Sequence, residues 1–185
     1  MALTEEQIEE IRAELETSFR PLFFFDDDPD GLCSFLLLYR KVKEGKGIVV
    51  KTAPGMDENF LKHIDEYNPD KIFILDKPMV SQEFIDGAKT KVIWIDHHEP
   101  VQRKNVKYYN PRINDDKDNR PTSYWAYRIA EGDLWIAMIG MIGDWFLPEF
   151  SDEFTKLYPH LLPDYIKKPE NALFETEIGK LIKIF

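Results

Sequence analysis

An acid and two adjacent histidines, Asp96, His97 and His98, carry side chains that can bind a metal ion and contact a substrate. They follow an apolar run at residues 92–95, which is typical of a strand buried on both faces. Open parallel sheets bind their ligands just outside the carboxyl ends of such strands. Neighbouring side chains at a strand end point in different directions, so one imidazole can hold a metal while the other contacts substrate. A surface turn is the alternative interpretation, and the choice depends on whether other acids reach the same edge.

Further aspartates follow other apolar segments of the chain. Three come after residues 22–25 and one each after residues 72–75 and 134–142, namely Asp26, Asp28, Asp30, Asp76 and Asp144. With Asp96 they make a crowded set of carboxylates, whose mutual repulsion divalent cations would remove. Carboxylate oxygens with imidazole nitrogens, and no thiolate, favour Mn²⁺ or Mg²⁺ over structural zinc. Two such ions about 3.5–4 Å apart can clamp a phosphate, so the sequence predicts a phosphoester or phosphoanhydride hydrolase.

The elements that must position these acids alternate between short apolar runs and segments of helical periodicity. This pattern predicts an α/β fold, a doubly wound, mainly parallel five-stranded sheet with helices on both faces. Strands are expected at residues 22–25, 48–50, 72–75, 92–95 and 106–109. Helices are expected at residues 4–19, 32–42, 57–67, 81–88, 121–130 and 134–142. Residues 1–147 form the expected catalytic core, and the proline-rich residues 148–185 a helical and loop extension.

Composition excludes several classes of protein. With 43% hydrophobic and 14% aromatic residues among 185, the chain can bury one sizeable core. No apolar run approaches the roughly 20 residues of a membrane span. The lone cysteine, Cys33, excludes an intrachain disulfide and indicates a reducing, cytoplasmic location. The net charge of −10 argues against a surface built for long nucleic acids.

Four motifs in order resemble the DHH phosphoesterase superfamily. They are Asp26-Asp27-Asp28-Pro29-Asp30-Gly31, Asp76, Asp96-His97-His98 and Gly143-Asp144. The superfamily includes RecJ-type exonucleases, oligoribonucleases, cyclic-dinucleotide phosphodiesterases and manganese pyrophosphatases. The resemblance covers about residues 20–147, and the first motif is similar to that of RecJ-like members of archaeal type.

The resemblance implies two Mn²⁺ ions, with Mg²⁺ as the alternative, and ligands at six positions: Asp26, Asp28, Asp30, Asp76, His97 and Asp144. Asp26 and Asp28 would bind the first ion. Asp30, His97 and Asp144 would bind the second. Asp76 would bridge both ions.

The remaining motif residues are expected to act on the substrate. Asp96 would orient the histidines and His98 would contact the scissile phosphate, so Asp76, Asp96 and His98 form the implied catalytic set. Ser34 would support the phosphate at a helix N-terminus, with an ordinary helix-start serine as the alternative. Trp145, beside Asp144, can stack on a base or simply pack at the rim.

Two functional hypotheses remain open from the sequence. The first is a manganese-dependent phosphohydrolase acting on short single-stranded nucleic acids or nucleotide-like substrates. The second is a non-catalytic scaffold that binds partners in a replication or repair complex. Pyrophosphatase is disfavoured because Phe24 stands four residues before Asp28, where those relatives carry histidine.

The second, substrate-binding domain of active relatives has no counterpart in this sequence. The chain is therefore expected to be the catalytic half of a longer protein or to use a partner protein for that domain. Tail residues Ile178, Leu181, Ile182 and Ile184 are expected to pack on such a domain or on another chain.

Overall fold

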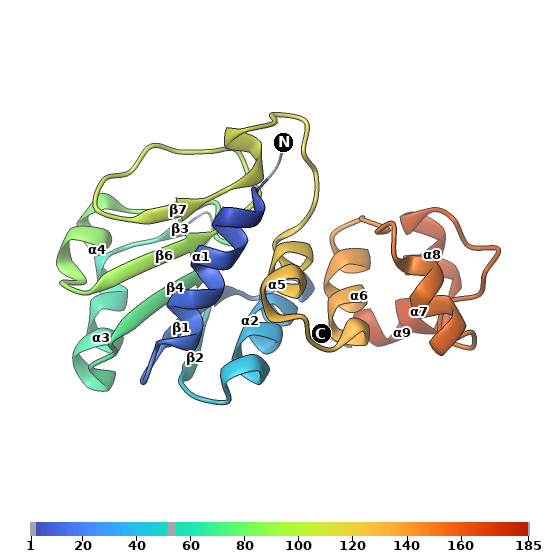
Figure 1. The fold of residues 1–185 in the computed structure, drawn as a ribbon, viewed down its shortest axis with the longest axis horizontal. Helices are drawn as coiled ribbons and strands as arrows, with labels where there is room; N and C mark the ends of the chain where they lie inside the picture. The colour runs from blue at the N-terminus through green and yellow to red at the C-terminus, as the bar shows by residue number, and fades with distance from the viewer. Residues whose placement is uncertain (1–2, 52–54, 185) are drawn as a thin grey trace.

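A computed structural model describes residues 3–51 and 55–184 and contains a parallel five-stranded sheet (Figure 1). The strands, in spatial order, are β2 (Lys46–Val50), β1 (Leu22–Asp26), β4 (Lys71–Leu75), β6 (Lys91–Ile95) and β7 (Lys107–Tyr109). Each strand pairs in parallel with its neighbours. The expected fold class is confirmed, and every predicted strand lies within two residues of its observed bounds.

Helices cover both faces of this sheet because its strands present apolar side chains on both sides. On one face, Phe23, Phe73 and Ile93 pack in a core with α1 (Glu5–Glu16), α2 (Pro29–Val42) and α5 (Thr122–Ala130). On the other face, Phe24, Ile74 and Trp94 pack with α3 (Leu61–Tyr67) and α4 (Gln82–Gly87). Successive side chains of a strand point to opposite faces, so each apolar run supplies both cores.

The C-terminal helices lie to one side of the sheet: the first of them packs beside α2 and α5, and the other three lie on its far side (Figure 1). They are α6 (Leu134–Gly143), α7 (Ser151–Leu157), α8 (Pro169–Glu175) and α9 (Glu177–Ile182). The expectation that the tail residues pack on a further domain or another chain is wrong for Ile178 and Ile182, which are buried in the same core as α6, whereas Leu181 and Ile184 are exposed. The division at residue 147 stays a prediction. Within the described ranges no helix has the length and apolar character needed to cross a membrane.

The start of α2 differs from its predicted position. It begins at Pro29 rather than at residue 32, because the Asp28 side chain caps it by accepting a hydrogen bond from the Gly31 N–H at 2.9 Å. Gly31 therefore lies inside the first turn of the helix. A Cβ at Gly31 would lie 2.6 Å from the Asp26 carbonyl oxygen, so close approach of helix and strand requires glycine there.

Other differences are local. The helix predicted at residues 4–19 ends at Glu16, although Thr4 and Gln7 form the expected capping box. Residues 57–67 divide into a 3₁₀ turn, η1 (Glu58–Phe60), and α3. A second, two-stranded parallel sheet, β3 (Gly55–Met56) with β5 (Met79–Val80), and the turn η2 (Pro111–Ile113) were not expected. Strands of two residues are too short to leave a periodic signal.

Candidate metal centre

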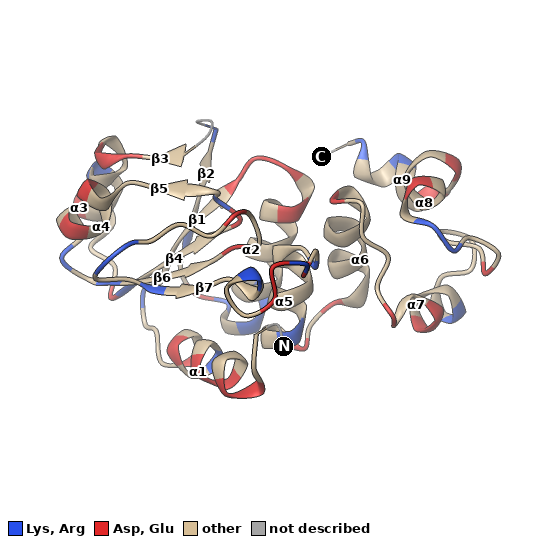
Figure 2. Cartoon of the chain, turned by 90° about the horizontal axis from the view of Figure 1, so that it is seen from above, with Lys and Arg blue, Asp and Glu red and all other residues tan. Residues whose placement is uncertain are grey.

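The register of three adjacent strands brings their terminal acids together. Phe25 pairs with Leu75, and Leu75 pairs with Ile95, at the carboxyl ends of β1, β4 and β6. The next residue of each strand is therefore an aspartate at the same edge: Asp26, Asp76 and Asp96. Figure 2 shows acidic segments gathered where the strands of the large sheet end, next to α5 and α6.

Asp76 sits at the centre of this edge in a constrained conformation. Its φ of 59° lies in the left-handed region, and the residue is 1% exposed. Its N–H donates to the Ile95 carbonyl at 3.0 Å, and the Thr122 hydroxyl donates to its Oδ1 at 3.0 Å. Aspartate and asparagine tolerate this backbone region better than most residues. The chain thus holds a buried carboxylate in a fixed direction.

Asp30 joins the sheet edge to α5. Its two carboxylate oxygens accept hydrogen bonds from the N–H groups of Thr122 and Ser123, each at 2.8 Å. These are the first two residues of α5, whose N–H groups have no partner within the helix. The positive end of the helix dipole stabilises the carboxylate there. Asp30 is 1% exposed and is held rigidly by these contacts.

His97 points into the cluster of acids. Its Nε2 atom lies 3.4 Å from Asp76 Oδ1, 3.6 Å from Asp144 Oδ2 and 3.8 Å from Asp30 Oδ2. Only the first of these separations approaches a hydrogen bond, and all three leave the nitrogen facing several acceptors at once. Burial lowers the pKa of His97, which favours the neutral imidazole that metals bind.

His98 is held by Asp96 in a different direction. Its Nδ1 atom lies 2.8 Å from Asp96 Oδ1, and because a carboxylate only accepts, Nδ1 carries the proton. The other oxygen of the fully buried Asp96 accepts from the His98 N–H, the Tyr108 hydroxyl and the Asn110 amide at 3.1–3.2 Å. The hydrogen bond from His98 to Asp96 raises the pKa of His98. Asp96 therefore orients His98 and favours its protonated form.

Asp26 has a partner that sequence reasoning missed. The ammonium group of Lys77, which is 2% exposed, lies 2.9 Å from Asp26 Oδ1. Lys77 directly follows Asp76, so the turn after β4 supplies both a carboxylate and a cation. Tyr108 and Thr122 were also missed as site residues. Asn110 was assigned no role, although Asn110-Pro111 after a strand resembles the family and follows β7 as the aspartates follow their strands.

Among the residues that the structure describes, the ligand atoms form three overlapping groups, and within each group they all lie within 4.8 Å of one another. The groups are Asp26, Asp28 and Asp76; Asp76, His97 and His98; and Asp30, His97 and Asp144. Asp76 and His97 each belong to two groups. All six predicted metal positions therefore converge.

The charges of this cluster fit a bound divalent cation. Burial, and then the neighbouring carboxylates, raise the pKa of Asp28 and raise that of Asp76 well above its ordinary value. The same causes raise the pKa of Asp144 to about 7. The part of each shift that comes from the neighbouring carboxylates is a repulsion that a bound cation would remove. The oxygen-rich donor set with imidazole and without sulfur suits Mn²⁺ or Mg²⁺.

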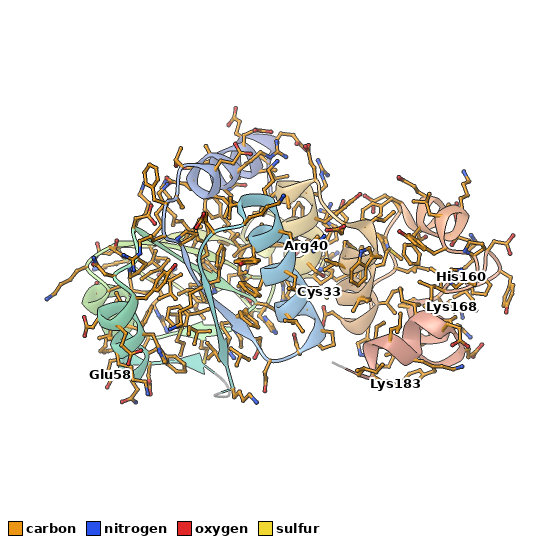
Figure 3. All side chains as sticks on the ribbon, turned by 90° about the horizontal axis from the view of Figure 1, so that it is seen from below. Cys33, Arg40, Glu58, His160, Lys168 and Lys183 are labelled. Atoms are coloured by element: carbon orange, nitrogen blue, oxygen red, sulfur yellow. The ribbon has the colours of Figure 1, made fainter. Side chains whose placement is uncertain are left out.

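The structure corrects the assignment of Ser34. This residue lies five positions after the first residue of α2, and its side chain is completely buried. It cannot touch a phosphate at the helix N-terminus, because the true N-terminus is at Pro29. Cys33, labelled in Figure 3, is also buried in the core, and burial raises the pKa of its thiol. His160 lies among the C-terminal helices away from the sheet (Figure 3).

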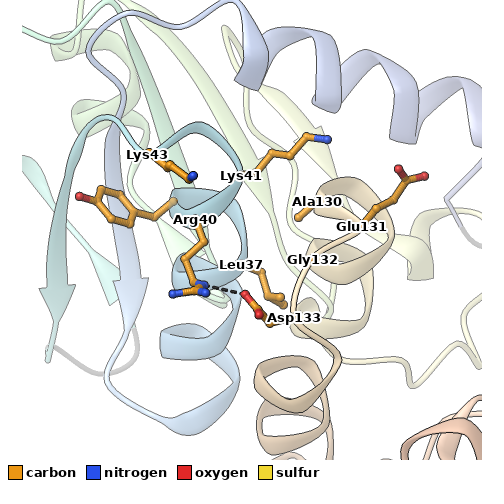
Figure 4. Close-up of a pocket in the computed structure, with 9 residues that line it drawn as sticks. Leu37, Arg40, Lys41, Lys43, Ala130, Glu131, Gly132 and Asp133 are labelled. Carbon is orange, nitrogen blue, oxygen red and sulfur yellow. Dashed lines mark hydrogen bonds and ion pairs between the residues drawn. The ribbon is translucent and has the colours of Figure 1, made fainter. Parts of the chain in front are cut away.

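Two hollows differ in their relation to the cluster. One of about 410 Å³ borders it and is lined by His97, His98, Asp144, Trp145 and Arg112, among others. A larger one of about 710 Å³ lies between α2 and the segment joining α5 to α6 (Figure 4). There the Arg40 guanidinium pairs with Asp133 at 2.6 Å. Arg40 is twelve residues along α2 from Asp28, roughly 18 Å at about 1.5 Å per residue, so this larger hollow is remote from the acids.

Solved structures share this fold. The chain is similar to exonuclease RecJ bound to manganese, with a TM-score of 0.66 at 17% identity, covering 98% of this chain and 61% of that one. RecJ from Thermus thermophilus in complex with Mn²⁺ has a TM-score of 0.66 at 14% identity, and the match covers 100% of this chain and 35% of that one. CDC45 from Entamoeba histolytica has a TM-score of 0.53 at 15% identity, and the match covers 77% of this chain and 34% of that one. This chain therefore spans less than two thirds of the length of each of these proteins.

Comparison of sequences gives the family. No curated protein sequence matches the chain significantly. Residues 22–144, which contain all the acids and both histidines of the cluster, match the model of the DHH family, N-terminal domain. That match extends over most of the chain, from the first strand of the large sheet to the end of α6. The chain therefore belongs to the DHH family.

Proposed function

We propose that the chain is a manganese-dependent phosphohydrolase that cleaves phosphodiester bonds in short single-stranded nucleic acids or nucleotide-like substrates. The observation that carries the proposal is the sharing of Asp76 and His97 between adjacent groups of ligand atoms. The Asp76 carboxylate has two oxygens and can bridge two neighbouring ions, as two-metal hydrolases require, whereas His97 Nε2 has one lone pair and can bind one ion. The RecJ structures that share the fold are described with manganese.

Each residue of the cluster has a proposed role. Asp26 and Asp28 would hold one ion, and Asp30, His97 and Asp144 the other, with Asp76 shared between them. When bound, such ions polarise a phosphoryl oxygen and lower the pKa of a coordinated water. The buried hydrogen bonds of Asp30, Asp76 and Asp96 keep these side chains in place before substrate arrives.

His98 would contact the scissile phosphate. Its Nδ1–H is engaged by Asp96, so the Nε2 atom is the one left for the substrate. The raised pKa of His98 favours an Nε2–H donor, which can stabilise the negative charge that develops on a phosphate oxygen. Its side chain is 40% exposed and borders the hollow of about 410 Å³, so a substrate can reach it.

The test is an assay of this chain with Mn²⁺ on short DNA and RNA oligomers, a cyclic dinucleotide and pyrophosphate. We expect cleavage of a phosphodiester that stops when the metal is chelated. Tight Mn²⁺ binding without cleavage would place the missing substrate contacts on another domain or a partner protein. The absence of both cleavage and Mn²⁺ binding would contradict the proposal.

A non-catalytic scaffold is the second hypothesis, and the fold similarity to CDC45 is the observation that favours it. A scaffold has no need of metal ligands. The present cluster would then be a set of mutually repelling carboxylates without compensation, which costs stability. Mn²⁺ titration separates the two hypotheses, because a scaffold predicts no stoichiometric binding at this cluster.

Mn²⁺ binding is expected to weaken about tenfold between pH 8 and pH 6 because Asp144 has a pKa of about 7 and must be ionised to bind metal. In the metal-free protein, folding stability changes with pH in the opposite direction to Mn²⁺ affinity: it falls as pH rises. The folded-state pKa lies above the ordinary value of 3.8, so Asp144 contributes full stability below about pH 4 and loses it as pH rises through 7. Calorimetric titration at several pH values measures the affinity. Asp144→Asn should bind more weakly with a shallower pH dependence, and equal wild-type affinity at pH 6 and pH 8 would refute the expectation.

A further inference from the structure

Trp145 occupies a backbone position that normally belongs to glycine. It follows Asp144, the residue at which α6 ends, and has a φ of 60°. Its N–H donates to the Ile142 carbonyl at 3.1 Å, and the next N–H, of Phe146, donates to Met141 at 2.8 Å. This pair of hydrogen bonds defines a Schellman helix end, whose left-handed residue is usually glycine because a side chain is strained there.

Trp145 is not part of the hydrophobic core. Seven non-glycine residues in the described ranges have positive φ, and Trp145 is the single aromatic one among them. Its side chain is 55% exposed, whereas Trp94 and Trp125 are buried in the core. A bulky residue kept in a strained, exposed position indicates a functional constraint.

The surroundings of Trp145 show what it can bind. Its ring lies 5.6 Å, centroid to centroid, from that of Phe174 of α8, which is 58% exposed. The ammonium group of Lys183 lies 5.3 Å from the centre of the Phe174 ring. Trp145 also lines the hollow of about 410 Å³ with His98 and Arg112, and the acids Glu99, Asp116 and Asp118 line it as well. Arg112 pairs with Glu99 at 2.8 Å. An exposed aromatic surface thus adjoins His98 at the edge of the acidic cluster.

We propose that Trp145, supported by Phe174, forms a stacking platform for one nucleobase of the substrate, whose phosphate lies at His98. This inference rests on the proposed function and narrows its substrate class to nucleotides, excluding phosphates that lack a base. An aromatic face binds any base, because every base offers a π-face of its own. The platform therefore selects nucleotides without selecting a base sequence. Phe174 also gives the C-terminal extension a part in substrate binding.

The experiment compares the binding of adenosine 5′-monophosphate and ribose 5-phosphate to the Mn²⁺-loaded chain by calorimetry. These two ligands share the sugar and the phosphate and differ in the base. We expect the nucleotide to bind about tenfold or more tightly. In Trp145→Gly this preference should disappear while ribose 5-phosphate binds as before, and Trp145→Phe should keep part of it. The melting temperature of Trp145→Gly should not fall, because glycine suits the left-handed backbone.

Trp135→Ala is the matched control, since Trp135 is 41% exposed on α6, the helix that ends just before Trp145, but does not line the hollow. It should retain the preference for the nucleotide. Equal affinities of the two ligands in the wild type would overturn the platform and leave the phosphohydrolase proposal standing. If the Mn²⁺-loaded chain binds neither ligand, the platform is overturned and the phosphohydrolase proposal stands. If the chain binds neither ligand and no Mn²⁺, both are overturned. An unchanged preference in Trp145→Gly would overturn the platform alone.

Discussion

Replacing Asp76 with asparagine is expected to abolish tight Mn²⁺ binding and to reduce hydrolysis by about 10³-fold, or about 4 kcal/mol of transition-state stabilisation. The reason is that Asp76 is the carboxylate shared between two groups, so its loss affects both proposed ions. Asparagine keeps a side-chain oxygen that can accept the hydrogen bond from the Thr122 hydroxyl, and it tolerates the φ of 59°. Alanine would lose both advantages and would confuse loss of chemistry with loss of structure.

The same substitution should raise the melting temperature of the metal-free protein at pH 8. Burial and the nearby Asp30 and Asp28 raise the pKa of Asp76 well above its ordinary value. A raised folded-state pKa means that stability is lost as pH rises through it, and asparagine does not titrate. Asp76→Asn should therefore be more stable than the wild type without Mn²⁺ and less responsive to added Mn²⁺.

Thermal unfolding with and without Mn²⁺, together with calorimetric titration, measures both effects. Asp65→Asn, at an exposed position of α3, is the matched control and should behave as the wild type. A variant Asp76→Asn that still binds Mn²⁺ with wild-type affinity would show that Asp76 is not a ligand. A fall in its metal-free melting temperature would show that another group already neutralises the charge of the Asp76 carboxylate when no metal is bound.

Substitutions of the two adjacent histidines are expected to change different quantities, kcat for His98 and Mn²⁺ affinity for His97. His98→Gln should lower kcat by about 10²–10³-fold, the range for a removed oxyanion donor, while Mn²⁺ affinity changes little. His97→Gln should instead weaken Mn²⁺ binding, because His97 Nε2 faces Asp30, Asp76 and Asp144. The different partners of the two rings are the physical reason, since Asp96 engages His98.

Steady-state kinetics at saturating Mn²⁺, with separate metal titrations, distinguish the two roles. Asp96→Asn is the companion variant, expected to lower kcat about 10- to 100-fold by releasing the orientation of His98. Its pH profile should shift as well, because the hydrogen bond to Asp96 is what raises the pKa of His98. If His98→Gln weakens Mn²⁺ binding as much as His97→Gln does, His98 is a metal ligand and its proposed contact with the phosphate is wrong.

Much of the fold follows from local pattern. The apolar runs ending at Asp26, Asp76 and Asp96 predicted strands at the right positions, because a strand buried on both faces needs apolar side chains throughout. Parallel strands place their carboxyl ends at one edge, so the convergence of these acids was also predictable. The order of the motifs predicted the family that the comparison of residues 22–144 shows.

The tertiary structure decided how each residue of the site is held. Asp30 is fixed by the N–H groups of α5, more than ninety residues along the chain, and no local pattern encodes such a contact. Three other features also depend on contacts between separate elements. They are the pairing of Lys77 with Asp26, the burial of Ser34 and the aromatic pair of Trp145 and Phe174. Short-range periodicity is a property of one element, whereas these contacts depend on how separate elements pack. The sequence alone thus predicted that the aspartates and histidines of the motifs meet at the sheet edge, and packing decided their other partners and the direction in which each side chain points.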